Sequence, residues 1–349
     1  MSLMPVSLSL IPAAIGAIER LPVPDAVTRA GIGALVGRTR KKLAVADPAA
    51  ERTFALDMAA FPIAEHADAA NAQHYEVPPD FFGRCLGPRR KYSCCYYDHH
   101  GATLAEAEER ALALTCAHAG LEDGQRILEL GCGWGSLTLW MAEHYPRAAI
   151  TAVSNSRSQR DYIIGEARAR GLGNVSVVTA DMNAFETDAR HDRIVSVEMF
   201  EHMSNWRALL ARTRRWLADG GCLFIHVFTH ANAPYRFDHR DKSDWIAQHF
   251  FTGGIMPSRG LMRQFADLYE VAETWDWNGE HYARTARDWL ANCDANRAEV
   301  TRLFAGVYGG DARLWLRRWR LFYLATEGLF GHAGGETWGV THYLLKPAR

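Results

Sequence analysis

The chain has 349 residues, 48% of them hydrophobic, which is enough to bury one large core, so the sequence predicts a globular protein. Lysine and arginine total 39 against 40 aspartate and glutamate residues, and this balance excludes the overall positive field that recruits nucleic acid. Seven scattered cysteines match neither a disulfide framework nor a zinc site, so we expect no bound metal and a location in the reducing cytoplasm.

The first 18 residues are apolar, but no basic residue precedes them, and Pro5 and Pro12 interrupt them. This pattern is typical of neither a secretory signal nor a membrane span, which needs about 20 uninterrupted apolar residues. Helical periodicity without a strand signal continues to residue 70, which predicts a helical N-terminal region over 1–70. The basic cluster from Arg38 to Lys42 is either a solvated helix end or a contact with an anionic membrane surface.

From Arg126 onward, short runs rich in β-branched residues alternate with helical patterns, and this alternation is typical of a parallel α/β sheet. The predicted strands are 126–130, 149–153, 175–179, 193–197, 222–227, 269–277 and 337–345. The predicted helices between the first five strands are 136–144, 159–170 and 206–217, and a long helical stretch separates the last two strands. The pattern therefore predicts an α/β fold with a seven-stranded, mostly parallel sheet and a late hairpin pair.

A glycine-rich loop at 129–135 (ELGCGWG) joins the first predicted strand to the first predicted helix. Glycines such as Gly131 and Gly133 permit a tight turn and let backbone amides approach a ligand, and the helix N-terminus favours a carboxylate. The loop differs from the dinucleotide form G-x-G-x-x-G, and no pyrophosphate cradle follows it. It therefore predicts S-adenosylmethionine as the cofactor instead of a nicotinamide.

Polar residues follow the next two strands at their carboxyl ends, where ligands of open α/β sheets bind. Asp181 is predicted to hydrogen-bond the adenine amino group, with Met182 packed on the ring. Asn155 occupies the place where an acidic residue often holds the ribose, and Gln159 lies one helical turn beyond it. Taken singly, each residue is equally well explained as a turn residue or a helix cap.

Six separate motifs make the chain similar to a known group of enzymes. They are 74–78 (HYEVP), 91–96 (KYSCCY), 129–135 (ELGCGWG), 196–203 (SVEMFEHM), 250–258 (FFTGGIMPS) and 336–342 (ETWGVTH). Over residues 74–346 the chain resembles the cyclopropane-fatty-acid-synthase-like methyltransferases, and within them the coclaurine-type plant N-methyltransferases.

The resemblance implies a class I, Rossmann-like methyltransferase domain over 121–349, with helical insertions at 231–267 and 283–330 that form a lid on the substrate. Residues 71–120 are then a connecting segment that covers the cofactor. The resemblance further implies that the Glu201–His202 pair faces the substrate. The residues that it assigns to the cofactor are Ser93, Gly131, Asn155, Gln159 and Asp181.

Members of this group catalyse two types of reaction, methylation of an alkene and methylation of an amine. Cyclopropane synthases methylate an alkene and hold a bicarbonate ion as the base that removes a proton afterwards. The residues that match their bicarbonate-binding positions are Cys94, Glu201, His226 and Tyr282. However, this chain carries Glu198 where those synthases carry glycine, and Glu327 where they carry a reactive cysteine. Both glutamates match the branch that methylates amines.

The chemistry of an amine acceptor explains these glutamates. An alkylamine arrives at neutral pH as a cation, so the site needs carboxylates to attract it and a base to remove its proton before methyl transfer. Glu198, Glu201 and Glu327 are the candidate carboxylates, and His202 is the candidate base because an imidazole ordinarily titrates near pH 6.5. Glu201 and His202 point to opposite sides in a strand, so for both to serve they must lie on a turn after the fourth strand.

Two alternatives stay open. The first reads Glu198 and Glu201 as solvated residues of a short helix, His202 as a helix cap and His226 as a core histidine. The second is a lipid-modifying enzyme that makes cyclopropane or methyl-branched acyl chains, which requires bicarbonate and peripheral membrane contact through the N-terminal region. The leading interpretation is an N-methyltransferase for a small, cyclic or alkaloid-like amine.

Overall fold

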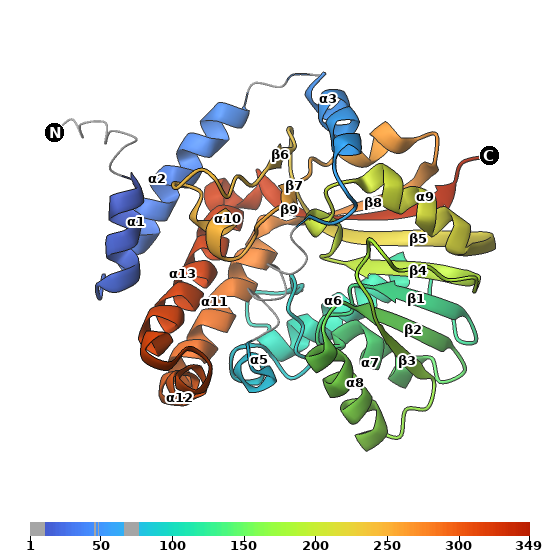
Figure 1. The fold of residues 1–349 in the computed structure, drawn as a ribbon, viewed down its shortest axis with the longest axis horizontal. Coiled ribbons are helices and arrows are strands. Elements are labelled where there is room, and N and C mark those ends of the chain that lie inside the picture. Colours follow the sequence, from blue (N-terminus) through green and yellow to red (C-terminus); the bar gives the residue numbers. More distant parts are fainter. Residues whose placement is uncertain (1–10, 45–46, 48, 66–76) are drawn as a thin grey trace.

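The computed structural model describes residues 11–44, 47, 49–65 and 77–349, and the side chains from residue 15 onward within these ranges (Figure 1). The first three residues of the predicted motif 74–78 lie outside the described residues.

The centre of the molecule is a seven-stranded sheet in the order β3-β2-β1-β4-β5-β9-β8 (Figure 1). Its strands are β1 (Arg126–Leu130), β2 (Ala149–Ser154), β3 (Val175–Thr179), β4 (His191–Val197), β5 (Leu217–His230), β8 (Tyr269–Asn278) and β9 (Trp338–Pro347). The first five strands pair in parallel, whereas β9 pairs antiparallel with both β5 and β8. This topology confirms the predicted seven-stranded, mostly parallel sheet.

The fifth strand, β5, is longer than predicted at both ends, and the polar residues added at its C-terminal end are buried by strand pairing. Thr229 and His230 look like the end of a strand in the sequence, yet both are buried. The Thr229 hydroxyl lies 2.8 Å from the Thr341 hydroxyl on β9, so the two polar groups satisfy each other across the ladder. Such cross-strand pairs stabilise a sheet but are invisible until the strand partner is known.

Helices flank the sheet, and local sequence signals fix their first turns. They are α6 (Leu104–His118), α7 (Ser136–His144), α8 (Arg157–Ala169) and α9 (Trp206–Trp216). Thr103 and Glu106 form a reciprocal capping box at the start of α6, and Asn205 caps α9 through the backbone N–H of Ala208. The strongly amphipathic α9 buries Trp206, whose indole N–H donates to the Phe200 carbonyl at 2.8 Å.

The two insertions differ in structure. Residues 283–330 are helical, as predicted, with α11 (Gly279–Ala295), α12 (Arg297–Tyr308) and α13 (Ala312–Phe330). Residues 231–267 are less helical than predicted, with one short helix, α10 (Trp245–His249), a short 3-10 helix, η5 (Leu261–Phe265), and a two-stranded sheet of β6 (Tyr235–Arg236) and β7 (Ile255–Met256). Pro234, Pro257 and the Gly253–Gly254 pair interrupt this stretch, and these residue types end helices.

The N-terminal region is helical in its described part, with α1 (Ile11–Arg20), α2 (Asp25–Leu43), α3 (Ala50–Asp57) and the 3-10 turn η2 (Met58–Ala60). Helices α1 and α2 lie against α13 (Figure 1). Two ion pairs join them, from Arg318 to Glu19 and from Arg320 to Asp25, each at 2.9 Å. No helix in the described part of the chain is long and apolar enough to cross a membrane.

Candidate active site

A large cavity opens at the carboxyl ends of β1, β2, β3 and β4, and its empty space, with the open mouth, measures about 1550 Å³. The predicted site residues that line it are Ser93, Gly131, Gly133, Asn155, Gln159, Asp181, Met182, Glu198, Glu201, His202 and Tyr282.

The glycine loop forms one end of the cavity and has the backbone that its sequence predicts. Gly131, Gly133 and Gly135 all have left-handed φ values, of 79°, 51° and 77°. A Cβ atom on Gly131 would lie 2.8 Å from Met199, and one on Gly135 would lie 2.5 Å from Ile163, so no larger residue fits at either position. The loop runs directly into the N-terminus of α7, where free amides and the helix dipole favour a carboxylate.

The ends of β2 and β3 place the other predicted cofactor residues beside this loop. The Gln159 side-chain oxygen accepts a hydrogen bond from the Ser154 hydroxyl at 2.8 Å, but its buried amide nitrogen has no partner among the described residues. A buried donor without an acceptor is costly unless a ligand supplies one. The ribose hydroxyls of S-adenosylmethionine supply such acceptors, so the residues present fit this cofactor.

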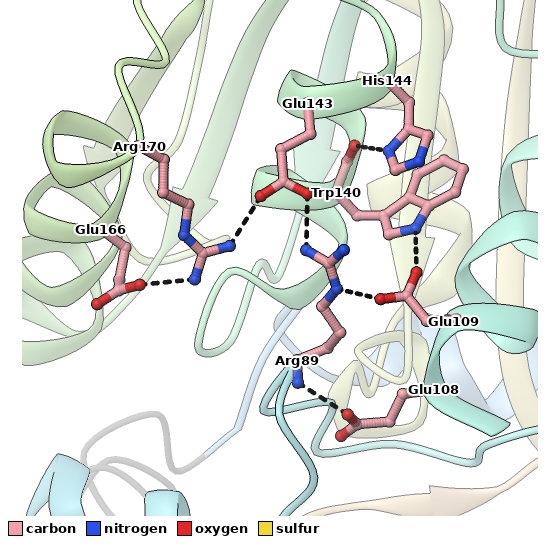
Figure 2. A network of polar contacts seen from close by, with 8 residues as sticks. All are labelled: Arg89, Glu108, Glu109, Trp140, Glu143, His144, Glu166 and Arg170. Carbon is pink, nitrogen blue, oxygen red and sulfur yellow. Dashed lines mark hydrogen bonds and ion pairs between the residues drawn. The ribbon is translucent and has the colours of Figure 1, made fainter. Parts of the chain in front are cut away.

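The segment that carries Ser93 is fixed by a network of ion pairs on its outer side (Figure 2). The Arg89 guanidinium bonds to Glu109 on α6 and, at 2.7 Å, to Glu143 on α7. The Glu108 carboxylate accepts from the backbone N–H of Arg89 at 2.8 Å, and burial raises its pKa to about 7. These contacts hold the chain so that Lys91 and Ser93 reach the cavity, where the Lys91 ammonium donates to the Ser93 hydroxyl.

Glu198 lies directly after β4 and lines the cavity, in a left-handed backbone conformation with φ of 47°. Its Oε1 accepts from the Cys94 backbone N–H at 2.8 Å, and its Oε2 accepts from the Tyr282 hydroxyl at 2.6 Å. The His226 Nε2 lies 3.1 Å from the same Oε1. Burial raises the pKa of Glu198. Three residues from distant segments therefore converge on one carboxylate.

Glu201 and His202 lie on the 3-10 turn η4 (Phe200–His202) after β4, and both reach the cavity. Glu201 is 1% exposed, and neither of its carboxylate oxygens has a hydrogen-bond partner among the described residues. Burial, together with the nearby negative charge of Glu198, raises the pKa of Glu201 well above its usual range. The His202 ring stacks on Phe251, with ring centroids 4.4 Å apart.

Three predicted residues do not line the cavity. Cys94 and His226 lie behind Glu198 and contact its carboxylate, as described above. Glu327 lies on α13, where its carboxylate bonds to Arg29 at 2.9 Å and to Arg287 at 3.1 Å. The prediction that Glu327 faces the acceptor is thus not supported by its position. Five residues along a helix turn about 140°, so Glu327 points away when Phe322 faces the cavity.

Several lining residues were not predicted from the sequence. They include Glu65, Arg90, Lys91, Tyr92, Thr115, Phe228, Phe251 and Phe322. Lys91, Tyr92 and Phe251 lie inside the motifs that carry the resemblance, so the signal was present without an assigned role. The others come from segments that reach the cavity only through the tertiary fold.

A glycine loop on the first strand, polar residues after the next two strands and a cavity at their carboxyl ends define a class I methyltransferase that depends on S-adenosylmethionine. The family model described as mycolic acid cyclopropane synthetase matches residues 64–331, and the chain belongs to this family.

Two relatives and one solved structure place the chain within the family. It is 38% identical over 289 residues to an (S)-coclaurine N-methyltransferase of Thalictrum flavum subsp. glaucum, which covers 81% of this chain and 80% of that protein. It is 30% identical to the cyclopropane-fatty-acyl-phospholipid synthase of Escherichia coli strain K12 over 271 residues, covering 77% of this chain and 66% of that protein. A crystal structure of coclaurine N-methyltransferase bound to N-methylheliamine and SAH superposes with a TM-score of 0.89 at 33% identity, covering 97% of this chain and 98% of that one.

Proposed function

We propose that this protein transfers a methyl group from S-adenosylmethionine to the nitrogen of a small, cyclic or alkaloid-like amine. The similarity to the coclaurine N-methyltransferases supports this function. The observation that carries it is the position of the Glu198 carboxylate.

Glu198 fills an anion position with a side chain of the protein itself. Of the four residues that match the bicarbonate-binding positions of cyclopropane synthases, Cys94, His226 and Tyr282 all contact its carboxylate. A bicarbonate ion held by these three groups would compete with a tethered carboxylate. Glu198 therefore argues against bicarbonate and against the lipid reaction that needs it.

The fourth of these residues, Glu201, is free to bind a cation. Its carboxyl group is buried in the cavity wall without a hydrogen-bond partner among the described residues, and its pKa is raised because ionisation would leave an unpaired buried charge. An ammonium ion in the cavity would remove this penalty by pairing with Glu201. A neutral alkene would not, so the site selects a protonated amine.

The chain's own residues then position the acceptor and remove its proton. When bound, the cofactor supplies an electrophilic methyl group on a sulfonium. Glu198 and Glu201 attract the ammonium, and His202 takes one proton from its nitrogen so that the lone pair becomes available. Phe251, stacked on His202, limits the movement of the imidazole and keeps water from the nitrogen.

The test is methyl transfer from radiolabelled S-adenosylmethionine, with a panel of cyclic secondary and tertiary amines compared with vesicles of unsaturated phospholipid. Each acceptor is assayed with and without bicarbonate. Label in the amines that does not depend on bicarbonate supports the proposal. Label in the lipid that requires bicarbonate would overturn it.

A further inference from the structure

The carboxylate of Glu19 on α1 joins the N-terminal region to a segment beside the cavity. Glu19 is only 9% exposed, although it is the last residue but one of α1. Its Oε1 accepts hydrogen bonds from the Trp245 indole N–H at 2.8 Å and from the Arg318 guanidinium at 2.9 Å. The His249 Nε2 lies 3.4 Å from the same oxygen. Side chains from α10 and α13 therefore converge on one oxygen of α1.

The three partners of Glu19 contribute in different ways. Burial lowers the pKa of His249, helped by the Arg318 charge, so this ring carries no charge. Arg318 supplies the positive charge, and its side chain is only 18% exposed. The Trp245 indole N–H is buried, and a buried donor that loses its acceptor is unfavourable. The ion pair with Arg318 thus holds Glu19 in place, and Glu19 holds the indole of α10.

The residues that follow α10 form part of the cavity wall. Phe251 and Thr252 come within three residues of its end, and both line the cavity. The Phe251 backbone N–H donates to the Ile246 carbonyl at 2.8 Å, and the Thr252 hydroxyl donates to the Ala247 carbonyl at 2.7 Å. Phe251 in turn stacks on His202. A movement of α10 would therefore move the ring that packs on the proposed base.

Aromatic packing forms a second connection from α10 to the cavity. The Trp245 ring centroid lies 5.4 Å from that of Phe250, and Phe250 stacks on Phe322 with centroids 4.5 Å apart. Phe322 lines the cavity from α13. Phe250 is fully buried, and close-packed rings of this kind do not shift independently of one another. The position of Trp245 therefore affects two sides of the cavity wall.

We propose that Glu19 is a positioning residue for methyl transfer: it holds α10 against α13 and thereby keeps Phe251 on the base His202. The inference rests on the proposed function, which gives His202 the role of the base. None of the described residues of α1 lines the cavity, so Glu19 acts on the reaction only through Trp245 and α10. The first helix of the chain is then a support of the active site.

The first experiment measures steady-state methylation of an amine that the wild-type protein accepts, together with the Kd for S-adenosylmethionine. Glu19→Ala removes the acceptor of the indole N–H, whereas Glu19→Gln keeps an oxygen there and removes the charge. Trp245→Phe keeps an aromatic ring without the N–H, and it tests the same contact if Glu19→Ala does not fold. The matched control is Asp25→Ala. Asp25 pairs with Arg320 on α13 at 2.9 Å, and no hydrogen bond or ion pair in the described part of the chain joins it to α10.

We expect Glu19→Ala to lower kcat/KM for the amine about thirtyfold, because a small misplacement around the reacting atoms can cost up to about a hundredfold. Trp245→Phe should cause a similar loss, and the double variant should lose no more than Glu19→Ala, since both changes break one contact. Glu19→Gln and Asp25→Ala should each lose less than about threefold, because the first keeps an acceptor for the indole and the second breaks a partly exposed ion pair. The Kd for S-adenosylmethionine should stay unchanged in every variant.

Three kinetic outcomes would overturn the proposal. They are an unchanged kcat/KM in Glu19→Ala, losses that multiply in the double variant, and a loss in Asp25→Ala or Glu19→Gln as large as that in Glu19→Ala. The first would show that α1 does not affect the reaction. The second would separate Glu19 from Trp245, and the third would reduce the effect to general loss of stability or of charge.

Hydrogen exchange followed by mass spectrometry tests the same contact without an acceptor. The backbone amides of residues 245–254 should exchange at least about tenfold faster in Glu19→Ala and Trp245→Phe than in wild type, and at the wild-type rate in Asp25→Ala. Unchanged exchange in Glu19→Ala would overturn the role of Glu19 while leaving amine methylation intact. Failure of the wild type to methylate any amine would instead overturn the proposed function, and the exchange rates would still decide whether Glu19 holds α10.

Discussion

Two groups of residues, the predicted cofactor residues and the cluster around Glu198, are here called the cofactor end and the acceptor end of the cavity, and they are built in different ways. Most predicted cofactor residues lie directly after β1, β2 and β3, so the strand just before each one places it, whereas Ser93 is held in place through contacts with α6 and α7. The acceptor end brings together Glu198 after β4, Tyr282 on α11, the Cys94 backbone and His226 on β5. Its geometry depends on contacts between segments that are far apart in sequence. The difference predicts that cofactor binding depends mainly on local sequence and that acceptor choice depends on the tertiary fold.

The largest effect is expected at the acceptor end, from loss of the base. His202→Ala should lower kcat for a cationic amine by about a thousandfold, within the range typical of a general base. The Kd for S-adenosylmethionine should stay unchanged, because His202 is not among the predicted cofactor residues. Steady-state kinetics and calorimetric titration of the cofactor measure the two quantities. Unchanged kcat would remove His202 from the reaction.

Glu201→Gln should lower kcat/KM for cationic amines by about a hundredfold, because a charged hydrogen bond contributes about 1.5–3 kcal/mol. The kcat/KM for a fluorinated amine that binds as a neutral molecule should fall much less. Equal losses for both amines would show that Glu201 shapes the cavity without binding charge.

The same variant should change the pH dependence of stability. The folded-state pKa of Glu201 is raised above its unfolded value, so the folded protein holds a proton that the unfolded chain loses. Stability is therefore lost as pH rises from the ordinary carboxyl range through the folded-state pKa. Urea unfolding of the cofactor-free protein at pH 5 and pH 9 should show a smaller loss in Glu201→Gln than in wild type.

Glu198→Gly tests whether the tethered carboxylate replaces a bound anion. Glycine tolerates the left-handed backbone at this position, so the variant should fold. Loss of one charged partner should cost roughly twentyfold in kcat/KM, and bicarbonate should recover part of it by occupying the position that Glu198 leaves. Activity that does not respond to bicarbonate would contradict the idea that Glu198 fills an anion position.

A substitution at the cofactor end should change cofactor binding without changing amine binding. Asp181→Ala should raise the Kd for S-adenosylmethionine about tenfold, the loss of one good hydrogen bond, and leave the KM for the amine unchanged. Because the Asp181 carboxylate also accepts the Asn183 backbone N–H at 2.6 Å, Asp181→Asn is the control that retains an acceptor for the turn. A parallel change in amine KM would break the proposed independence of the two ends.

The contrast between the two ends also explains how far the sequence could be interpreted. The strands and the glycine loop were predictable because hydrophobic periodicity and the turn residues Gly131 to Gly135 are local signals. The partners of Glu198 were visible only as separate motif positions, since their contact is made by the order of the strands. His342 lies inside the motif 336–342 without an assigned role, and His118 gave no signal, because their contact depends on the register of β5 with β9 and on the packing of α6.

Substitution of Glu327 is expected to have the smallest effect on activity. It tests whether a residue that matches the amine-methylating branch in sequence also shares its role. Its carboxylate pairs with Arg29 on α2 and Arg287 on α11, and its side chain is 14% exposed. Glu327→Gln should therefore change the KM of a cationic amine by less than about twofold, while lowering the free energy of unfolding by about 1 kcal/mol through the lost ion pairs. Arg29→Gln should reproduce most of that loss in stability. A rise in the KM for the amine in Glu327→Gln but not in Arg29→Gln would contradict this expectation. It would mean that the acceptor end extends beyond the cavity to α13. The match of Glu327 to the amine-methylating branch would then be a better guide to its role than the direction in which its side chain points.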